Sequence, residues 1–214
     1  PIAFTANHYG WFQTAGVAQE PPPVHPSVGK RFVPSDVDFG RPVYEAAFDD
    51  PDELDDWKLE GGDVARVTDD GNLLLKSEKH QVYWLTKQIP ADFLLEFTVR
   101  PHDRKQGLNI VFFNTTGLNG ENIFKVPIKP RDGSLKQYWN GDLQSYHVSY
   151  WAGAGAKAGT RGGQANLRRN PGKTLLASGN DLITGGKTGS YQTVRIYKRG
   201  GMIRVTVDDV VSVA

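Results

Sequence analysis

The sequence predicts an all-β fold, a jelly-roll sandwich of antiparallel sheets, and three observations support this prediction. The 214 residues include 24 glycines and 13 prolines, a density of breakers that opposes long helices. The apolar stretches are short and alternate with polar residues at period two, as in half-buried strands. These stretches recur with turn signals between them, a pattern typical of sandwiches and jelly rolls. The length suits one domain with a proper core.

Residues 1–42 are expected to form a proline- and aromatic-rich arm or strap against a sandwich domain of residues 43–214, with a linker as the alternative. The run Pro21-Pro22-Pro23 opposes both helix and strand pairing. The same segment contains aromatic side chains that indicate local packing, namely Tyr9, Trp11, Phe12 and Phe32. The chain begins Pro1-Ile2-Ala3, which we interpret as a mature end after loss of a signal peptide. A protein that acts in the periplasm or outside the cell is therefore expected.

The remaining elements follow in chain order. An aspartate-capped acidic turn is expected over residues 50–57. Strands are expected over the following ranges: 93–99, 108–113, 145–151, 191–197 and 202–207. Gly200 and Gly201 supply the backbone freedom of a tight hairpin between the last two strands.

Charge, cysteine content and motifs exclude several classes of function. With 25 basic and 24 acidic side chains, the net charge of +1 excludes a broad nucleic-acid-binding surface. The absence of cysteine excludes disulfides, thiolate metal sites and cysteine nucleophiles. No apolar run approaches the length of a membrane helix, and no phosphate loop, dinucleotide fingerprint or G-x-S-x-G elbow is present. No cofactor or metal is predicted, although a structural calcium on Asp49 and Asp208 stays open.

The first group of candidate residues lies in the expected strand over 145–151. Alternation puts Tyr146, Val148 and Tyr150 on one face, and His147, Ser149 and Trp151 on the other. A face with His, Ser and Trp is unusual for a core and typical of the floor of a sugar cleft. A hydrogen-bonded structural histidine is the alternative for His147, and a core position is the alternative for Trp151.

The second group lies in the stretch from Gln164 to Gly172. Arg168 and Arg169 follow Asn166, and together they can hold a carboxylate or a sulfate. A solvated or salt-bridged turn is the alternative for the two arginines. Further polar and aromatic candidates for sugar contacts are His80, Trp84, Asn109 and Asn114. For Trp84 a core position is the alternative.

Several stretches resemble known families. Residues 43–49, Asp56-Trp57 and residues 71–75 resemble the first strands of concanavalin A-like lectin and glucanase sandwiches. Over about residues 43–210, the chain resembles the domain of unknown function 1961 family, a group found chiefly beside bacterial polysaccharide-degrading genes. The stretches that show this likeness are 80–84, 90–93, 107–113, 146–150 and 166–172.

The resemblance implies a β-sandwich that faces a glycan. Jelly-roll polysaccharide lyases of the same shape use a His/Tyr pair and an Arg, Asn or Gln that neutralises a uronate carboxylate. By this likeness His147 is the expected base, Tyr138 or Tyr150 the acid, and Arg168 or Arg169 with Asn166 the carboxylate clamp. Tyr138 is the better acid, because alternation places Tyr150 on the face opposite His147. The expected activity is β-elimination, by a lyase or a dehydratase, on uronate-containing poly- or oligosaccharides.

Two other functions stay open. A non-catalytic, lectin-like module would need only aromatic platforms and hydrogen-bonding groups. A glycoside hydrolase would need two carboxylates roughly 5–10 Å apart, whereas Glu96 and Glu121 lie on separate expected elements. The sequence indicates no oligomeric state.

Overall fold

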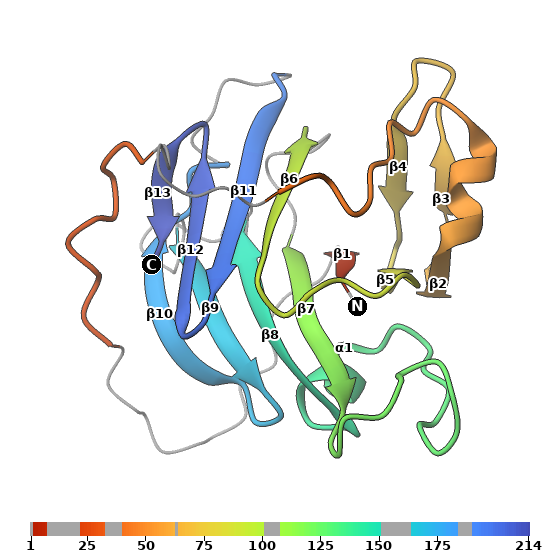
Figure 1. Cartoon of the computed structure of the whole chain (residues 1–214). Helices are drawn as coiled ribbons and strands as arrows, with labels where there is room; N and C mark the ends of the chain where they lie inside the picture. Colours follow the sequence, from red (N-terminus) through yellow and green to blue (C-terminus); the bar gives the residue numbers. More distant parts are fainter. Residues whose placement is uncertain are drawn as a thin grey trace.

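The computed structural model forms two antiparallel sheets packed face to face, which confirms the predicted all-β sandwich (Figure 1). It describes residues 2–7, 22–32, 40–62, 64–100, 108–150, 164–183 and 190–214. A two-stranded sheet lies beside the sandwich. No helix in these ranges has the length and apolar character needed to cross a membrane.

The elements in chain order are β1 (Ala3–Asn7), the 3-10 helix η1 (Pro51–Asp56), β2 (Trp57–Gly61), β3 (Val64–Val67), β4 (Leu73–Lys76), β5 (His80–Leu85), β6 (Phe93–Val99), β7 (Asn109–Gly117), α1 (Leu135–Trp139), β8 (Leu143–Tyr150), β9 (Gln164–Asn170), β10 (Thr174–Asn180), β11 (Gln192–Arg199), β12 (Met202–Val207) and β13 (Val210–Val213). The larger sheet has the order β10-β9-β8-β7-β1-β5-β2, and the smaller one β13-β12-β11-β6.

The elements expected from local signals are present. The acidic turn is η1, which begins after Asp50, whose side chain accepts a hydrogen bond from the Asp52 N–H at 2.9 Å. The expected hairpin joins β11 and β12, and Gly200 at its turn has a φ of 53°. A positive φ of this kind is available to glycine without steric cost. Local sequence therefore determines these elements.

The N-terminal segment contributes a central strand as well as a strap. β1 lies between β5 and β7 and pairs with both in antiparallel register. Ile2 and Ala3 are buried, with exposures of 4% and 0%. Within the described segment 22–32, residues 29–32 instead run along β13, where the Gly29 N–H donates to the Val211 carbonyl at 2.8 Å. Residues 29–32 thus lie against the four-stranded sheet, whereas residues 3–7 are part of the seven-stranded sheet.

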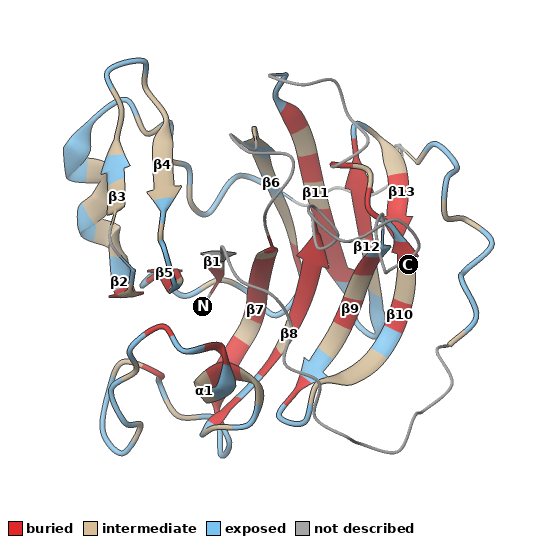
Figure 2. Ribbon diagram, turned by 180° about the vertical axis from the view of Figure 1, so that it is seen from behind, coloured by how far each residue is buried: buried red, intermediate tan, exposed pale blue. Residues whose placement is uncertain are grey.

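Two apolar clusters lie on opposite faces of the seven-stranded sheet. The first fills the space between the two sheets and includes Val111, Val148 and Tyr150. The second lies on the outer face, the face turned away from the four-stranded sheet, and includes Trp84 and Phe112 from the strands. Residues 118–139, which end in α1 and are called the cover segment below, close this second cluster, and Figure 2 shows the buried side of α1 beside β7 and β8.

A buried carboxylate attaches the cover segment to the sheet. Glu60 on β2 is 5% exposed and forms a bidentate pair with Arg131, at 2.9 Å from Nε and 2.6 Å from Nη2. The hydroxyl of Tyr138 and the indole N–H of Trp84 donate to the same carboxylate at 2.8 and 2.9 Å. A buried charge is tolerated when it is paired and hydrogen-bonded in this way. The network therefore fixes the cover segment over one half of the outer face.

Candidate functional site

The other half of the outer face is polar. It is formed by β8, β9 and β10, and we call it the polar half. Its side chains are Ser145, His147, Ser149, Asn166, Arg168, Asn170 and Ser178, with Trp139 and Lys173 at its border with the cover segment.

Strand register brings these side chains together. On β8 and β9 the cross-strand pairs are His147 with Arg168, Ser149 with Asn166, and Ser145 with Asn170. Val148 and Tyr150 point into the cluster between the sheets, which confirms the predicted alternation of β8. His147 therefore lies on the outer face, as the period of a strand requires.

His147 is held as a neutral ring. It is 2% exposed, and its ring lies 5.4 Å from that of Phe112 and 6.3 Å from that of Trp139. Burial lowers the pKa of His147 to about 3, and the charges of Arg168 and Lys173 act in the same direction. The imidazole is thus uncharged at neutral pH.

Asn170 links His147 to Ser145. Its Nδ2 donates to His147 Nδ1 and to Ser145 Oγ, at 2.9 Å in each case. Its Oδ1 is buried and has no partner among the described residues, and the same is true of Trp139 Nε1. A buried donor or acceptor without a partner is costly. The polar half therefore contains one acceptor and one donor that a polar ligand can satisfy.

Two cationic side chains border the same region. Lys173 Nζ lies 4.3 Å from the centroid of the Trp139 ring, and Arg168 Nη1 donates to the Lys173 carbonyl at 2.9 Å. Burial lowers the pKa of Lys173, and the charge of Arg168 lowers it further. None of the ion pairs among the described residues includes Lys173. The Lys173 ammonium thus has no carboxylate partner among the described residues, and such a charge favours an anionic ligand.

The two tyrosines expected as acids do not face His147. Tyr150 is 7% exposed and lies between the sheets, on the opposite face of β8. Tyr138 donates its proton to Glu60 beneath the cover segment, and burial raises the pKa of both phenols. Neither hydroxyl is placed to protonate a leaving group at the polar half, which corrects both assignments.

Three expected sugar contacts are also corrected. Trp84 is fully buried under the cover segment. Asn114 donates from Nδ2 to the Ala91 carbonyl at 3.0 Å, in the connection between β5 and β6. Asn109 alternates with Ile110 along β7 and so shares a face with Val111, which packs between the sheets. None of the three borders His147.

The remaining predicted residues divide between the two halves. Asn166 belongs to the polar half, where its Oδ1 accepts from Ser178 Oγ at 3.0 Å. His80 is half-buried at the covered half, where burial lowers its pKa and the Asp132 carboxylate opposes that effect. Arg169 is exposed and alternates with Arg168, so it lies on the other face of β9. Trp151 lies outside the described residues.

Five residues in the polar half or at its border were missed by sequence reasoning, namely Ser145, Asn170, Ser178, Trp139 and Lys173. Ser145 and Asn170 could have been predicted from the sequence. The strand alternation that turns His147 and Arg168 outward places these two residues on the same face. Trp139 and Lys173 lie outside these strands, so strand periodicity does not find them.

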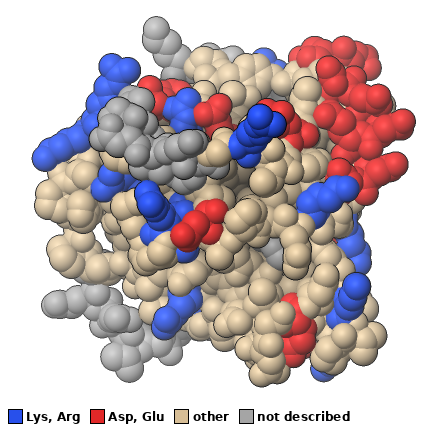
Figure 3. Space-filling model, viewed as in Figure 1, with Lys and Arg blue, Asp and Glu red and all other residues tan. Residues whose placement is uncertain are grey.

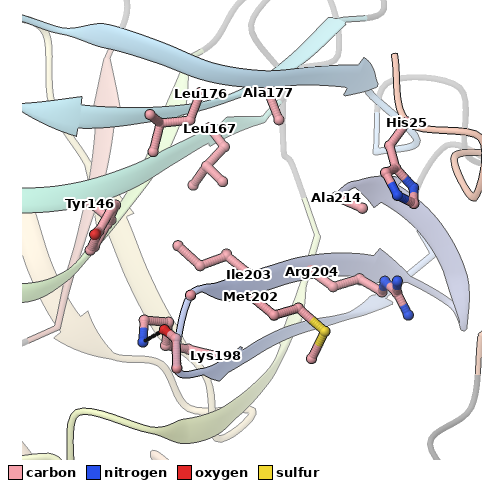
Figure 4. Close-up of a pocket in the computed structure, with 12 residues that line it drawn as sticks. His25, Tyr146, Leu167, Leu176, Ala177, Lys198, Met202, Ile203, Arg204 and Ala214 are labelled. Atoms are coloured by element: carbon pink, nitrogen blue, oxygen red, sulfur yellow. Dashed lines mark hydrogen bonds between the residues drawn. The ribbon is translucent and has the colours of Figure 1, made fainter. Parts of the chain in front are cut away.

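Two other surface features, a cleft and an acidic patch, have less support as sites. A cleft of about 380 Å³ opens between the β9–β10 edge and the β11–β12 hairpin, with Leu167, Leu176 and Ile203 in its wall (Figure 4). Its buried cation, Lys198, is already bonded to the Gly200 carbonyl and to Asp92.

Acidic side chains gather around η1 (Figure 3), yet no three His, Asp or Glu of the described residues are grouped to hold a metal.

Three comparisons place the chain among known proteins. A family model described as Domain of unknown function (DUF1961) matches residues 41–214. The uncharacterized protein YesU of Bacillus subtilis (strain 168) is 29% identical over 147 residues, which are 67% of this chain and 66% of YesU, just under two thirds of that relative. A crystal structure of a Bacillus subtilis protein of unknown function with a galectin-like fold superposes with a TM-score of 0.73 at 24% identity, over 82% of this chain and 80% of the other. The last comparison supports the jelly-roll fold.

Proposed function

The chain belongs to the DUF1961 family, a domain of unknown function, and from this premise we propose that the polar half of the outer face binds an acidic saccharide. One observation carries the proposal. A buried acceptor, Asn170 Oδ1, and a buried donor, Trp139 Nε1, lack partners among the described residues next to the Lys173 ammonium. The hydroxyls and the carboxylate of an acidic sugar ring can bond to both side chains, and the carboxylate complements the positive charge.

The neighbouring side chains support a saccharide over a simple anion. The Trp139 and His147 rings lie 6.3 Å apart and 23° from parallel, so aromatic rings border the polar groups, a combination common in sugar sites. Ser145, Ser149 and Asn166 add hydroxyl and amide groups on the same face. The expected ligand class is a uronate-containing oligosaccharide, such as those from alginate, pectic or sulfated algal glycans.

Calorimetric titration with a panel of such oligosaccharides and their neutral counterparts tests the proposal. We expect binding of the acidic ligands, and we expect Lys173→Gln to weaken it by about 10–100-fold, the range for one contact to a charged group. Lys129→Gln is the matched control, because Lys129 is exposed on the cover segment away from the polar half. No binding across the panel, or equal loss in both variants, contradicts the proposal.

A reaction at the same site is a second proposal, favoured by the neutral state of His147. In a β-elimination, a base takes the proton from the carbon next to the uronate carboxylate, and a cation stabilises the resulting enolate. The electron pair then forms the carbon–carbon double bond while the bond to the leaving oxygen breaks. That oxygen takes the bonding pair and gains a proton from water. His147 is unprotonated at neutral pH, and a bound carboxylate would raise its lowered pKa towards the range in which a general base works.

The elimination is tested by the ultraviolet absorbance of the α,β-unsaturated uronate product. We expect His147→Gln to lower the rate by about 10²–10⁴-fold, the usual contribution of a general base. Binding without product formation across the panel supports the lectin-like alternative and rejects the proposed elimination.

A hydrolytic mechanism has less support. Glu96 is ion-paired with Arg195 on the four-stranded sheet, and Glu121 is bonded to Asn119 in the cover segment. Glu60, the buried carboxylate of the outer face, is bonded to Arg131, Trp84 and Tyr138. These carboxylates do not form the facing pair that glycoside hydrolysis uses.

A periplasmic or extracellular site of action stays a prediction from sequence.

A further inference from the structure

The two hydrogen-bond partners of Asn170 Nδ2 can each reverse their roles. Ser145 Oγ and His147 Nδ1 both accept from Nδ2 at 2.9 Å. A serine hydroxyl can donate as well as accept, and so can a neutral imidazole nitrogen, depending on its tautomer. The Asn170 amide can therefore turn over and keep both bonds, with Oδ1 as the acceptor of both.

The two amide orientations correspond to two different tautomers of the His147 ring. In the present orientation Nδ1 accepts, so the proton of the neutral ring is on Nε2, and Nε2 is a donor. In the turned orientation Nδ1 carries the proton and donates to Oδ1, so the lone pair of Nε2 becomes available. The first form of His147 can donate to a sugar oxygen, and the second can accept a proton.

The amide atom that does not contact Ser145 or His147 decides between the two orientations, through the ligand group that it meets. Asn170 is 2% exposed, and its Oδ1 has no partner among the described residues. A ligand donor at that position stabilises the present orientation. A ligand acceptor, such as a carboxylate oxygen, favours the turned one, because Nδ2 would then face it.

We propose that Asn170 is a positioning residue that sets the tautomer of His147, and that an acidic ligand turns its amide and makes Nε2 the proton acceptor. The ligand-dependent half deepens the proposed function and rests on it. The tautomer of the free protein does not depend on that function. The protons lost from Nε2 and gained at Nδ1 exchange with solvent water.

Two-bond ¹H–¹⁵N spectra of the histidine rings at neutral pH test the proposal. The protein has five histidines, and the His147 signals are those lost in His147→Gln. We expect the Nε2–H tautomer in the free protein. In Asn170→Asp, where both side-chain oxygens accept, we expect the Nδ1–H form. Asn166→Asp is the matched control, because Asn166 lies on the same face but bonds to Ser178, and it should leave the tautomer unchanged.

Addition of a uronate oligosaccharide to the native protein should shift His147 towards the Nδ1–H form, while the indole N–H signal of Trp139 reports binding separately. The proposal is overturned by an Nδ1–H ring in the free protein, by an unchanged tautomer in Asn170→Asp, or by bound ligand with no tautomer change. If no uronate binds, the proposed function fails and the free protein and Asn170→Asp still test the role of Asn170. If Asn170→Asp does not fold, the native spectra alone test it.

Discussion

Substitution of Tyr138 by phenylalanine separates a structural role from a catalytic one. The hydroxyl donates to Glu60 Oε2 at 2.8 Å, and the ring packs at 5.6 Å from Phe112 and 6.1 Å from Trp84. Phenylalanine keeps the ring contacts and removes one hydrogen bond to a buried carboxylate. Such a bond contributes about 1.5–3 kcal/mol. Because Glu60 Oε2 keeps its bonds to Trp84 and Arg131, we expect a loss near the lower end of that range.

Urea unfolding measures this loss, with saccharide binding and elimination measured on the same samples. Tyr191→Phe is the control, because the Tyr191 hydroxyl bonds to Asn72 at 2.8 Å but the residue is 44% exposed. We expect a change of less than about 0.5 kcal/mol for this control and unchanged function in both variants. Full stability with lost elimination in Tyr138→Phe would refute the reasoning and make Tyr138 the acid.

Three further predictions concern the sheet and its histidine. Thr5→Pro removes a ladder hydrogen bond of the central strand β1, so we expect a loss of about 2 kcal/mol or more in urea, whereas an unchanged midpoint would place β1 elsewhere. Gly179→Ala puts a Cβ 1.8 Å from the Ser212 carbonyl oxygen, so calorimetry should show a Tm lower by roughly 2–12 °C, against no change for Gly201→Ala, which has open space. Folding lowers the pKa of His147 from 6.5 to about 3. The effect of this residue on the free energy of unfolding is therefore constant above about pH 6.5, and stability falls by up to about 1.4 kcal/mol per pH unit as the pH drops from there towards 3. Urea midpoints should show a flatter pH dependence in His147→Gln, and identical profiles would reject a buried neutral ring.

Elements determined by neighbouring residues were predictable from the sequence. The hairpin at Gly200 depends on a local positive φ, and η1 depends on the Asp50 cap. The division of His147 and Tyr150 between two faces follows from strand period alone. These features need no knowledge of which strands become neighbours.

Features that depend on distant contacts were not predictable. β1 has the short sequence Ala-Phe-Thr-Ala-Asn, and its central position depends on the edges that β5 and β7 offer. The bond from Tyr138 to Glu60 spans 78 residues of sequence, and it removes Tyr138 from the polar half while burying Trp84. An aromatic residue in a polar stretch looks the same in sequence whether it lies in a cleft or under a covering loop.

The polar half combines residues that local sequence pattern predicts with residues that only distant contacts bring there. Arg168 and His147 were predicted because strand alternation turns them outward, and cross-strand pairing brings them together. Trp139 and Lys173 border them only because α1 and the β9–β10 turn meet, where the Gly172 N–H donates to the Trp139 carbonyl at 2.7 Å. The side chains that make the polar half suitable for an acidic sugar therefore include two that come from outside its strands.

The indole N–H resonance of Trp139 tests the central claim most directly, because its Nε1 is buried at the polar half and has no partner among the described residues. Among the signals of the five tryptophans, it is the one lost in Trp139→Phe. We predict that titration with uronate oligosaccharides shifts this resonance in a saturable way and that the neutral counterparts shift it far less. An indole signal that stays unchanged across the whole panel would contradict the claim that the polar half binds an acidic saccharide.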